Sequence, residues 1–355
     1  MTGQTNKNGI RTDVGYKRIA TEEAFITREL LDIYVKMLKE GSHDDPGFGS
    51  LWGFYATNLQ AERPRIINER LQDIGERRIA DMDAAGIDVA ILSLTSPGVQ
   101  ILPRDLAIAQ ARLANDQLAD AVRKYPDRFA GLVAVAPQAP EEAAKELERG
   151  IKELGFKGVI INSHTQGEYL SDQKFWPILE AAEACDAPIY LHPNTLPKGM
   201  VEPFIECGLD GAIFGFGVET SFHMLRIITS GALDRFPNLK FVLGHLGEAL
   251  QYWMWRIDYM HEATVRSKRY ESLKPLKKKP SDYLKENVWI TTSGQQFEPA
   301  IKYAQEVLGK DRVMYAMDYP YQYVPQEVAD LDNMDMSPED LKAFYQTNAE
   351  KLFKL

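Results

Sequence analysis

Short apolar runs rich in β-branched residues alternate with longer amphipathic stretches along most of the chain. This alternation is typical of repeated βα units, and apolar residues at consecutive positions predict parallel strands covered on both faces. We predict eight strands: Lys17–Ala20, Val89–Leu94, Ala130–Ala136, Gly158–Ile161, Pro188–Leu191, Lys240–Leu243, Val288–Thr291 and Val313–Ala316.

Helices are expected between these strands. Gly86 and Gly155 are placed to end two of them, and Pro140 is placed to begin one, where its missing N–H costs nothing. The expected helices are Glu69–Ala85, Leu106–Lys124, Pro140–Leu154, Asp172–Cys185, Thr220–Thr229, Leu246–Val265, Pro299–Leu308 and Pro338–Phe353.

Eight strands, each followed by a helix, predict an α/β fold of the (β/α)8 TIM-barrel type, with an open doubly wound sheet as the alternative. No GxGxxG motif follows the first strand, which disfavours the nucleotide-binding form of the open sheet. We expect a flexible N-terminal segment, residues 1–14, and one barrel domain, residues 15–355. The long connection after the first strand carries Trp52, Phe54 and Tyr55 within residues 44–65 and is predicted to form a lid or an interface.

Composition narrows the class of partner. The net charge of −10 argues against nucleic acid, and no apolar run approaches the length of a membrane span. Cys185 and Cys207 lack metal-site spacing, and the N-terminus lacks the apolar core of a signal peptide. We therefore expect a soluble, cytoplasmic protein. The basic run 274–280 is interpreted as a solvated loop.

Polar side chains gather where the predicted strands end, which is where barrels of this type carry their chemistry. Three of the six histidines and several carboxylates fall there. Convergent carboxylates and imidazoles can hold a divalent cation and leave positions open for substrate. The strand ends carry Thr21, Glu22, Glu23, Thr95, Ser96, Asn162, Ser163, His164, His192, His245, Thr292, Ser293 and Asp318, whereas His43, His223 and His261 have no such placement.

These residues and their neighbours resemble the amidohydrolase superfamily, in its branch of non-oxidative aromatic acid decarboxylases, over nearly the whole chain. The resemblance is strongest to the 5-carboxyvanillate type, and γ-resorcylate and 2,3-dihydroxybenzoate decarboxylases are similar as well. It is carried by Arg18–Phe25, Ser50–Tyr55, Gly158–Gly167, Gly211–Thr220, Gly244–Glu248 and Tyr315–Tyr323.

The resemblance implies one divalent metal ion held by Glu22, His192 and Asp318, with Mn2+ expected in preference to Zn2+. It implies no organic cofactor. Asp318 would also be the proton donor, while His245 and Glu248 would form a catalytic histidine–carboxylate pair. The substrate-binding residues implied are Arg63, Thr95, Tyr321, Arg256 and His164. Arg256 would enter the site of a neighbouring subunit, so a homodimer or homotetramer is expected; Thr95 as a helix cap and Glu248 as a first-turn residue remain equal alternatives.

The residue two positions after Glu22 is Ala24, where many members carry a histidine, and the 5-carboxyvanillate type shares that alanine. We therefore predict non-oxidative decarboxylation of an ortho-hydroxylated aromatic acid, best 5-carboxyvanillate to vanillate and CO2 in lignin-derived aromatic catabolism. The alternatives are γ-resorcylate or 2,3-dihydroxybenzoate as substrate, a mononuclear hydrolase or hydratase of the same superfamily, and a binding protein without activity.

Overall fold

The strands form one closed ring in the computed structural model, which describes residues 4–355. All pair in parallel and in chain order. They are β1 (Ile19–Phe25), β2 (Val89–Leu94), β3 (Phe129–Gly131), β4 (Val133–Ala134), β5 (Val159–Asn162), β6 (Ile189–His192), β7 (Phe241–Leu243), β8 (Val288–Thr291) and β9 (Val313–Met314).

Two junctions complete the ring. Leu132 alone separates β3 from β4: its N–H donates to Leu92 O, and the N–H of Val133 donates to Gly158 O on the other side. The last strand meets the first where Thr21 N–H donates to Tyr315 O and Ala24 N–H donates to Tyr319 O. The structure is a (β/α)8 barrel, as predicted, with the third strand interrupted at Leu132.

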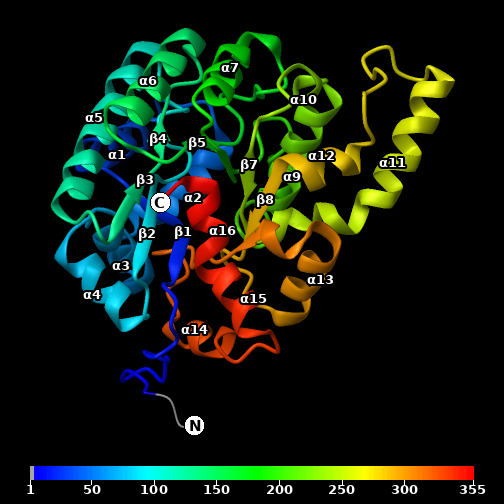
Figure 1. Ribbon diagram of the computed structural model, residues 1–355. Coiled ribbons are helices and arrows are strands. Elements are labelled where there is room, and N and C mark those ends of the chain that lie inside the picture. The colour runs from blue at the N-terminus through cyan, green and yellow to red at the C-terminus, as the bar shows by residue number, and fades with distance from the viewer. Residues whose placement is uncertain (1–3) are drawn as a thin grey trace.

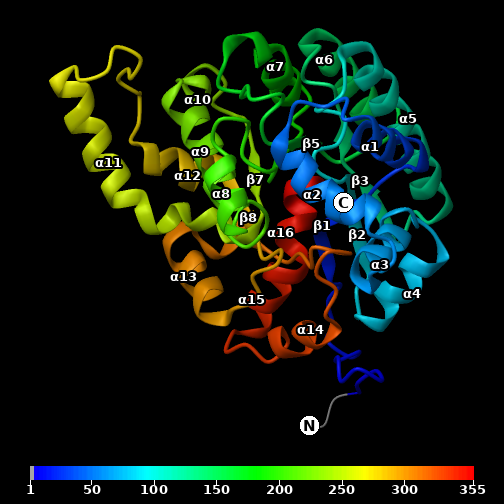
Figure 2. The same cartoon turned by 180° about the vertical axis from the view of Figure 1, so that it is seen from behind.

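Helices surround the strands on the outside (Figure 1). α11 and the loop after it extend away from the rest of the molecule, and Figure 2 shows α2 and α8 on the opposite side from the view of Figure 1. The α-helices are α1 (Arg28–Glu40), α2 (Pro46–Thr57), α3 (Glu62–Leu71), α4 (Glu76–Ala84), α5 (Arg104–Lys124), α6 (Pro140–Lys152), α7 (Trp176–Ala184), α8 (Glu202–Cys207), α9 (Gly215–Thr229), α10 (Ala232–Arg235), α11 (Leu250–Ser267), α12 (Pro280–Asn287), α13 (Glu298–Leu308), α14 (Pro325–Leu331), α15 (Pro338–Lys342) and α16 (Asn348–Phe353).

Four short turns complete the elements: η1 (Gln173–Phe175), η2 (His245–Ala249), η3 (Lys310–Arg312) and the π-helical turn η4 (Ala343–Thr347). The strands are buried on both faces, with every residue of β5 and β7 buried. This burial explains why their sequences are apolar at consecutive positions rather than alternating.

Several predicted boundaries are wrong. The first strand runs to Phe25 rather than ending at Ala20, so Glu22 and Glu23 lie within it. The single helix expected over residues 69–85 is two helices, because Asp73 Oδ1 accepts from Gly75 N–H and Arg78 N–H and begins a new helix there. The helix expected from Leu246 begins at Leu250, after the turn η2.

The long connection after β1 packs on the residues that follow β2 and β6. Within it, α2 brings Trp52 into full burial, and the indole N–H donates to Ser96 O at the end of β2 (3.0 Å). Gly47 lies against Thr195, where an added Cβ would come within 2.5 Å of the threonine Cβ. At the N-terminus, Ile10 is fully buried, so the segment expected to be flexible packs on the barrel at that point.

Candidate active site

Glu22 is directed into the barrel mouth by an irregularity in β1. The pairing of β1 with β2 shifts by one residue between Ala20 and Glu23, which is a β-bulge of the kind that redirects side chains near active sites. Burial alone would raise the pKa of Glu22. The neighbouring His245 and His192 and the hydroxyl of Ser293 outweigh burial and lower that pKa to about 2, so the side chain is a carboxylate.

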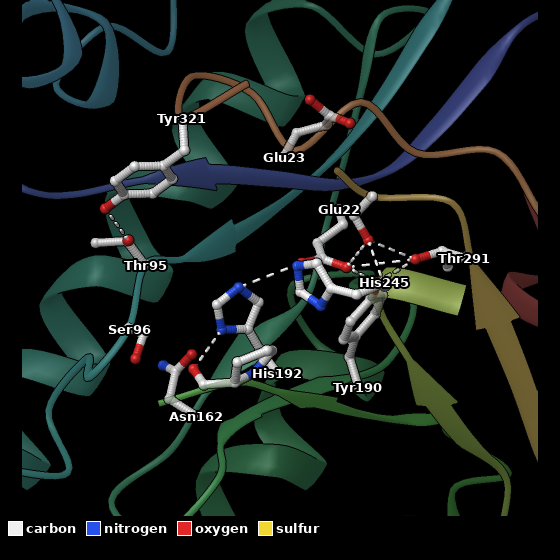
Figure 3. A network of polar contacts seen from close by, with 12 residues as sticks. Glu22, Glu23, Thr95, Ser96, Asn162, Tyr190, His192, His245, Thr291 and Tyr321 are labelled. Atoms are coloured by element: carbon white, nitrogen blue, oxygen red, sulfur yellow. Dashed lines mark hydrogen bonds and ion pairs between the residues drawn. The ribbon is translucent and has the colours of Figure 1, made fainter. Parts of the chain in front are cut away.

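His192 ends β6 with its tautomer fixed by the backbone. Its Nδ1 lies 2.8 Å from Pro193 O, a carbonyl that can only accept, so Nδ1 carries the proton. The lone pair is therefore on Nε2, which lies 3.3 Å from Glu22 Oε1 (Figure 3). A histidine anchored in this way is ready to bind a cation through Nε2.

His245 and Glu248 lie on a turn with an unusual backbone. Four residues of η2 other than glycine have positive φ, from +51° to +61°: His245, Leu246, Glu248 and Ala249. Left-handed conformations cost about 1–2 kcal/mol per residue, and such strain is concentrated at functional sites. The turn brings Glu248 Oε1 to 2.8 Å from His245 Nδ1 and leaves Nε2 facing Glu22 Oε1 at 3.6 Å.

The two carboxylates beside His245 determine its charge. Burial would lower the pKa of His245, but Glu248 and Glu22 outweigh burial and raise that pKa to about 10. Space for Glu248 depends on Gly217 of α9, since a Cβ there would lie 2.9 Å from Glu248 Oε2. The histidine–carboxylate pair expected from the sequence is therefore present in the structure.

Asp318 follows β9 with a φ of +70°. Its carboxyl group belongs to a set, with Glu22 and His245, whose ligand atoms all lie within 4.8 Å of one another. Burial and the charge of Glu22 raise the pKa of Asp318 to about 7, against the effect of His245 and His192. Asp318 can therefore hold a proton near neutral pH, in contrast to Glu22.

The donor set fits one divalent cation. Two atoms bound to one ion at about 2.1 Å and roughly 90–110° lie about 3.0–3.4 Å apart, close to the spacing of Glu22 Oε1 from the two imidazoles. Glu22 Oε1 is buried and has no hydrogen-bond partner among residues 4–355. The ligands expected were Glu22, His192 and Asp318; the compact set contains His245 in place of His192, although His192 is closer to Glu22.

The predicted substrate-binding residues separate into two groups. Thr95 Oγ1 and the Tyr321 hydroxyl are 2.7 Å apart beside the carboxylate cluster (Figure 3), and Arg63 donates to Tyr321 O (3.1 Å). His164 is buried with both ring nitrogens bonded to the backbone, to Thr195 O and Gly167 N–H. Arg256 lies exposed on α11.

A cavity of about 490 Å³ opens beside His245 and Glu248. Phe214, Phe216 and Trp253 of α11 are among the residues that line it. It is large enough for a single aromatic ring with substituents, and its apolar wall matches the face of such a ring.

The sequence did not reveal the role of three hydroxyl groups that surround Glu22 Oε2, those of Tyr190, Thr291 and Ser293. Strand alternation could have indicated two of them. Tyr190 is two residues before His192 and Thr291 is two residues before Ser293, and side chains two residues apart on a strand point to the same face. Ser293 was noted only as a strand-end residue.

Comparison with known proteins identifies the family. The amidohydrolase family profile matches residues 49–355. The chain belongs to the amidohydrolase family. It is 59% identical to 5-carboxyvanillate decarboxylase from Novosphingobium aromaticivorans, whose structure was solved in complex with manganese and 4-hydroxy-3-methoxy-5-nitrobenzoic acid. The match covers 99% of this chain and 100% of that one, with a TM-score of 0.96.

Two further relatives support the same family. 5-Carboxyvanillate decarboxylase from Sphingomonas paucimobilis is 38% identical, covers 96% of this chain and 100% of that one, and has a TM-score of 0.88. γ-Resorcylate decarboxylase from Polaromonas sp. is 40% identical over 297 residues, 81% of this chain and 90% of the relative. Among residues 4–355, none of the helices is both long and apolar enough to cross a bilayer.

Proposed function

We propose that the protein is a metal-dependent carboxy-lyase that converts an ortho-hydroxylated aromatic acid to the phenol and CO2, with 5-carboxyvanillate as substrate. The observation that carries the proposal is the convergence of Glu22, His192, His245 and Asp318 around one buried carboxylate oxygen that accepts no hydrogen bond from residues 4–355. The identity of 59% to a 5-carboxyvanillate decarboxylase supports the choice of substrate. In the analogue bound to that relative, the nitro group stands where the substrate has the carboxylate that leaves.

Glu22, His192 and Asp318 would hold the cation, and the manganese in relatives makes Mn2+ the first ion to test. When bound, this ion would stabilise negative charge on the phenolate and on the adjacent carboxylate. The tautomer of His192 supports its place in the set, because its Nε2 lone pair faces Glu22 Oε1. Loss of bound metal from His192→Ala but not from His245→Ala would support this assignment; the reverse result would give the ligand position to His245.

Asp318 would supply the proton. Its carboxyl group delivers H+ to the ring carbon that bears the carboxylate, and a C–H bond forms while the ring loses aromaticity. The C–C bond to the carboxylate then breaks, its electron pair returns to the ring, and CO2 leaves. Each turnover consumes one proton, so Asp318 must be reprotonated from solvent before the next.

The other polar residues would bind and orient the ring. His245, held by Glu248, faces the same space and can donate to the phenolate oxygen. Arg63 suits a carboxylate through its planar guanidinium, and the Thr95–Tyr321 pair lines the side near Arg63. The lid helix α2 packs Trp52 over the end of β2 and helps to exclude water.

The direct test of the activity is CO2 release. Purified protein loaded with Mn2+ is incubated with 5-carboxyvanillate, γ-resorcylate and 2,3-dihydroxybenzoate, and headspace CO2 is measured. We expect release with 5-carboxyvanillate and its loss after chelation of the metal. No CO2 from any of the three, together with hydrolysis of a lactone or hydration of an unsaturated acid, would replace the proposal with the hydrolase or hydratase alternative.

Asp318→Asn tests the proton donor, since the side-chain amide cannot give up a proton near neutral pH. We expect kcat to fall about 10²- to 10⁴-fold in protein that still binds Mn2+, as measured by metal analysis. Substantial turnover by the metal-loaded variant would remove Asp318 from this role.

Arg256 is proposed to act in the site of a neighbouring subunit. It lies on α11, which also exposes Trp253 (55%), Trp255 (78%) and Tyr259 (58%), an apolar surface of the kind that a second copy covers. We expect a homodimer or a tetramer built from such dimers, measurable by light scattering.

A mixing experiment tests the direction in which Arg256 acts. Subunits carrying Arg256→Ala are combined with subunits carrying Asp318→Asn, each homogeneous preparation being nearly inactive. A mixed dimer regains one intact site only if Arg256 crosses the interface, so recovery of CO2 release supports the proposal. Absence of recovery in dimers shown to have mixed would place the arginine in its own subunit's site.

A further inference from the structure

Three hydroxyl groups surround the second oxygen of Glu22 (Figure 3). The Tyr190 hydroxyl and Ser293 Oγ both form short hydrogen bonds to Glu22 Oε2, and Thr291 Oγ1 lies 3.3 Å from the same atom. Thr291 Oγ1 is also 2.8 Å from the Tyr190 hydroxyl and 2.8 Å from Ser293 Oγ. We call Tyr190, Thr291 and Ser293 the hydroxyl cage.

The hydrogen-bonding capacity of Oε2 is fully used. A carboxylate oxygen has two lone pairs, and each hydroxyl has one proton to donate. The O–H groups of Tyr190 and Ser293 fill the two positions. Thr291 has a single proton, which it can donate to one of these two hydroxyl oxygens or to Oε2. Such charge-assisted O–H···O− bonds are among the stronger hydrogen bonds in proteins. Oε2 is thereby occupied by the protein itself.

The space around Oε2 is equally restricted. At Gly244, an added Cβ would lie against Glu22 Oε2 and 3.0 Å from Ser293 Oγ, so only glycine fits without displacing the cage. Ser293 Oγ also lies 3.3 Å from the N–H of His245, which connects the cage to the turn that carries the histidine. The three cage residues come from β6, β8 and the residues directly after β8, all buried, and are therefore fixed by the barrel itself.

The other oxygen of the same carboxylate has the opposite surroundings. Glu22 Oε1 accepts no hydrogen bond from any residue in 4–355, although it is buried, and two imidazole nitrogens lie within 3.6 Å. A buried charged oxygen without a partner is costly, and a bound cation would satisfy it. The two oxygens of Glu22 are thus assigned to different tasks.

We propose that the hydroxyl cage positions Glu22 so that it offers Oε1 alone to the cation. This inference rests on the proposed function and deepens it. An ortho-hydroxybenzoate chelates through its phenolate and its carboxylate and needs two positions on the ion. If Oε2 were free to turn toward the ion, it would compete with the substrate for one of them. The cage residues are therefore positioning residues that favour chelating over single-point ligands.

The experiment uses two ligands of the Mn2+-loaded protein, both measured by calorimetric titration. 4-Hydroxy-3-methoxy-5-nitrobenzoate can chelate the ion through its phenolate and its nitro group, whereas vanillate has the same ring without the nitro group. Thr291→Val removes a hydroxyl while keeping the shape of the side chain, and Thr291→Ser keeps the hydroxyl while losing a methyl group. Tyr190→Phe and Ser293→Ala remove the two direct donors. Tyr345→Phe is the matched control, because it removes a buried phenol hydroxyl at Val328 O, in the core near the C-terminus.

We expect Tyr190→Phe and Ser293→Ala to weaken Mn2+ binding about 10- to 100-fold, the usual effect of removing a partner of a metal ligand. At saturating Mn2+, the ratio of nitrobenzoate affinity to vanillate affinity should fall about tenfold in Tyr190→Phe, Ser293→Ala and Thr291→Val. The ratio should not change in Thr291→Ser or Tyr345→Phe. A merely structural role would change melting temperature and leave this ratio constant.

Two results would overturn the proposal. One is Mn2+ affinity in Tyr190→Phe and Ser293→Ala within about twofold of the parent; the other is an unchanged affinity ratio in Thr291→Val, which is close to isosteric and should fold. Both readouts need only metal and ligand binding. They therefore remain informative if the parent releases no CO2, a result that would count against the proposed function and not against the cage.

Discussion

The two faces of β1 carry the same residue type in adjacent positions and use it differently. Glu22 and Glu23 are both 3% exposed, and their side chains lie on opposite sides of the strand (Figure 3). Glu22 faces the barrel mouth, where imidazoles and hydroxyls lower its pKa to about 2. Glu23 faces the outer layer of helices, where burial raises its pKa to about 8 against two backbone N–H donors.

The partners explain the difference. Glu23 accepts from the N–H of Met317 and of Tyr319, one at each oxygen and both at 3.0 Å, so each of its oxygens has a backbone partner. These two residues flank Asp318, and Glu23 therefore fixes the backbone on both sides of it. Burial alone therefore does not mark a site. Glu22 keeps one oxygen without a hydrogen bond from residues 4–355, whereas Glu23 holds the loop that bears Asp318.

The largest expected effect is on the inner face. Glu22→Gln replaces the charged ligand oxygen with a neutral amide and cannot satisfy both the cage and the cation. We expect Mn2+ to be lost on dialysis and CO2 release to fall by about 10³-fold or more, since the ion contributes several kcal/mol of charge stabilisation. Metal analysis and the CO2 assay check this; full metal occupancy in the variant would contradict the ligand assignment.

Glu23→Gln, the same substitution on the outer face, should have a smaller and different effect. The NH2 group of the glutamine would face a backbone N–H. One buried hydrogen bond would therefore be lost, at a cost of about 1–3 kcal/mol in the free energy of unfolding. We expect chemical denaturation to show that loss in the free energy of unfolding, with Mn2+ stoichiometry retained. Loss of metal on the same scale as in Glu22→Gln would erase the distinction between the two faces.

A further effect is the pH dependence of stability contributed by Glu23. Its pKa is about 8 in the folded protein and near 4.5 when unfolded, so folding takes up a proton between these values. The contribution is fully present below pH 4.5 and is lost as the pH rises to 8, by about 1.4 kcal/mol per pH unit. Unfolding of metal-free protein at several pH values should show a shallower slope in Glu23→Gln. Equal slopes would mean that Glu23 is ionised across this range.

Much of the fold followed from the sequence because parallel strands buried on both faces are apolar at consecutive positions. The eight-unit barrel was predicted in this way and confirmed. The bulge before Glu23 was not predicted, because two adjacent glutamates disfavour a strand by propensity and only the tertiary pairing with β2 forms it. The break at Gln72–Gly75 depends on a local side-chain bond from Asp73 that competes with the helix.

The site was predicted in part. Strand-end position identified Glu22, His192, His245 and Asp318, because chemistry gathers at one rim of a barrel. The left-handed turn at residues 245–249 could not be predicted, since only one of its five residues is glycine and the rest are strained. The hydroxyl cage was missed because Tyr190 and Thr291 are residue types common in any buried strand. Their role appears only when the second oxygen of Glu22 is located.

We propose that Glu22, His192 and Asp318, far apart in the chain, meet at one cation. The most direct measurement is anomalous X-ray diffraction from crystals of the protein grown with Mn2+. We expect one strong manganese peak within bonding distance of Glu22 Oε1, His192 Nε2 and an Asp318 oxygen. A peak elsewhere, or none in fully loaded crystals, would contradict it.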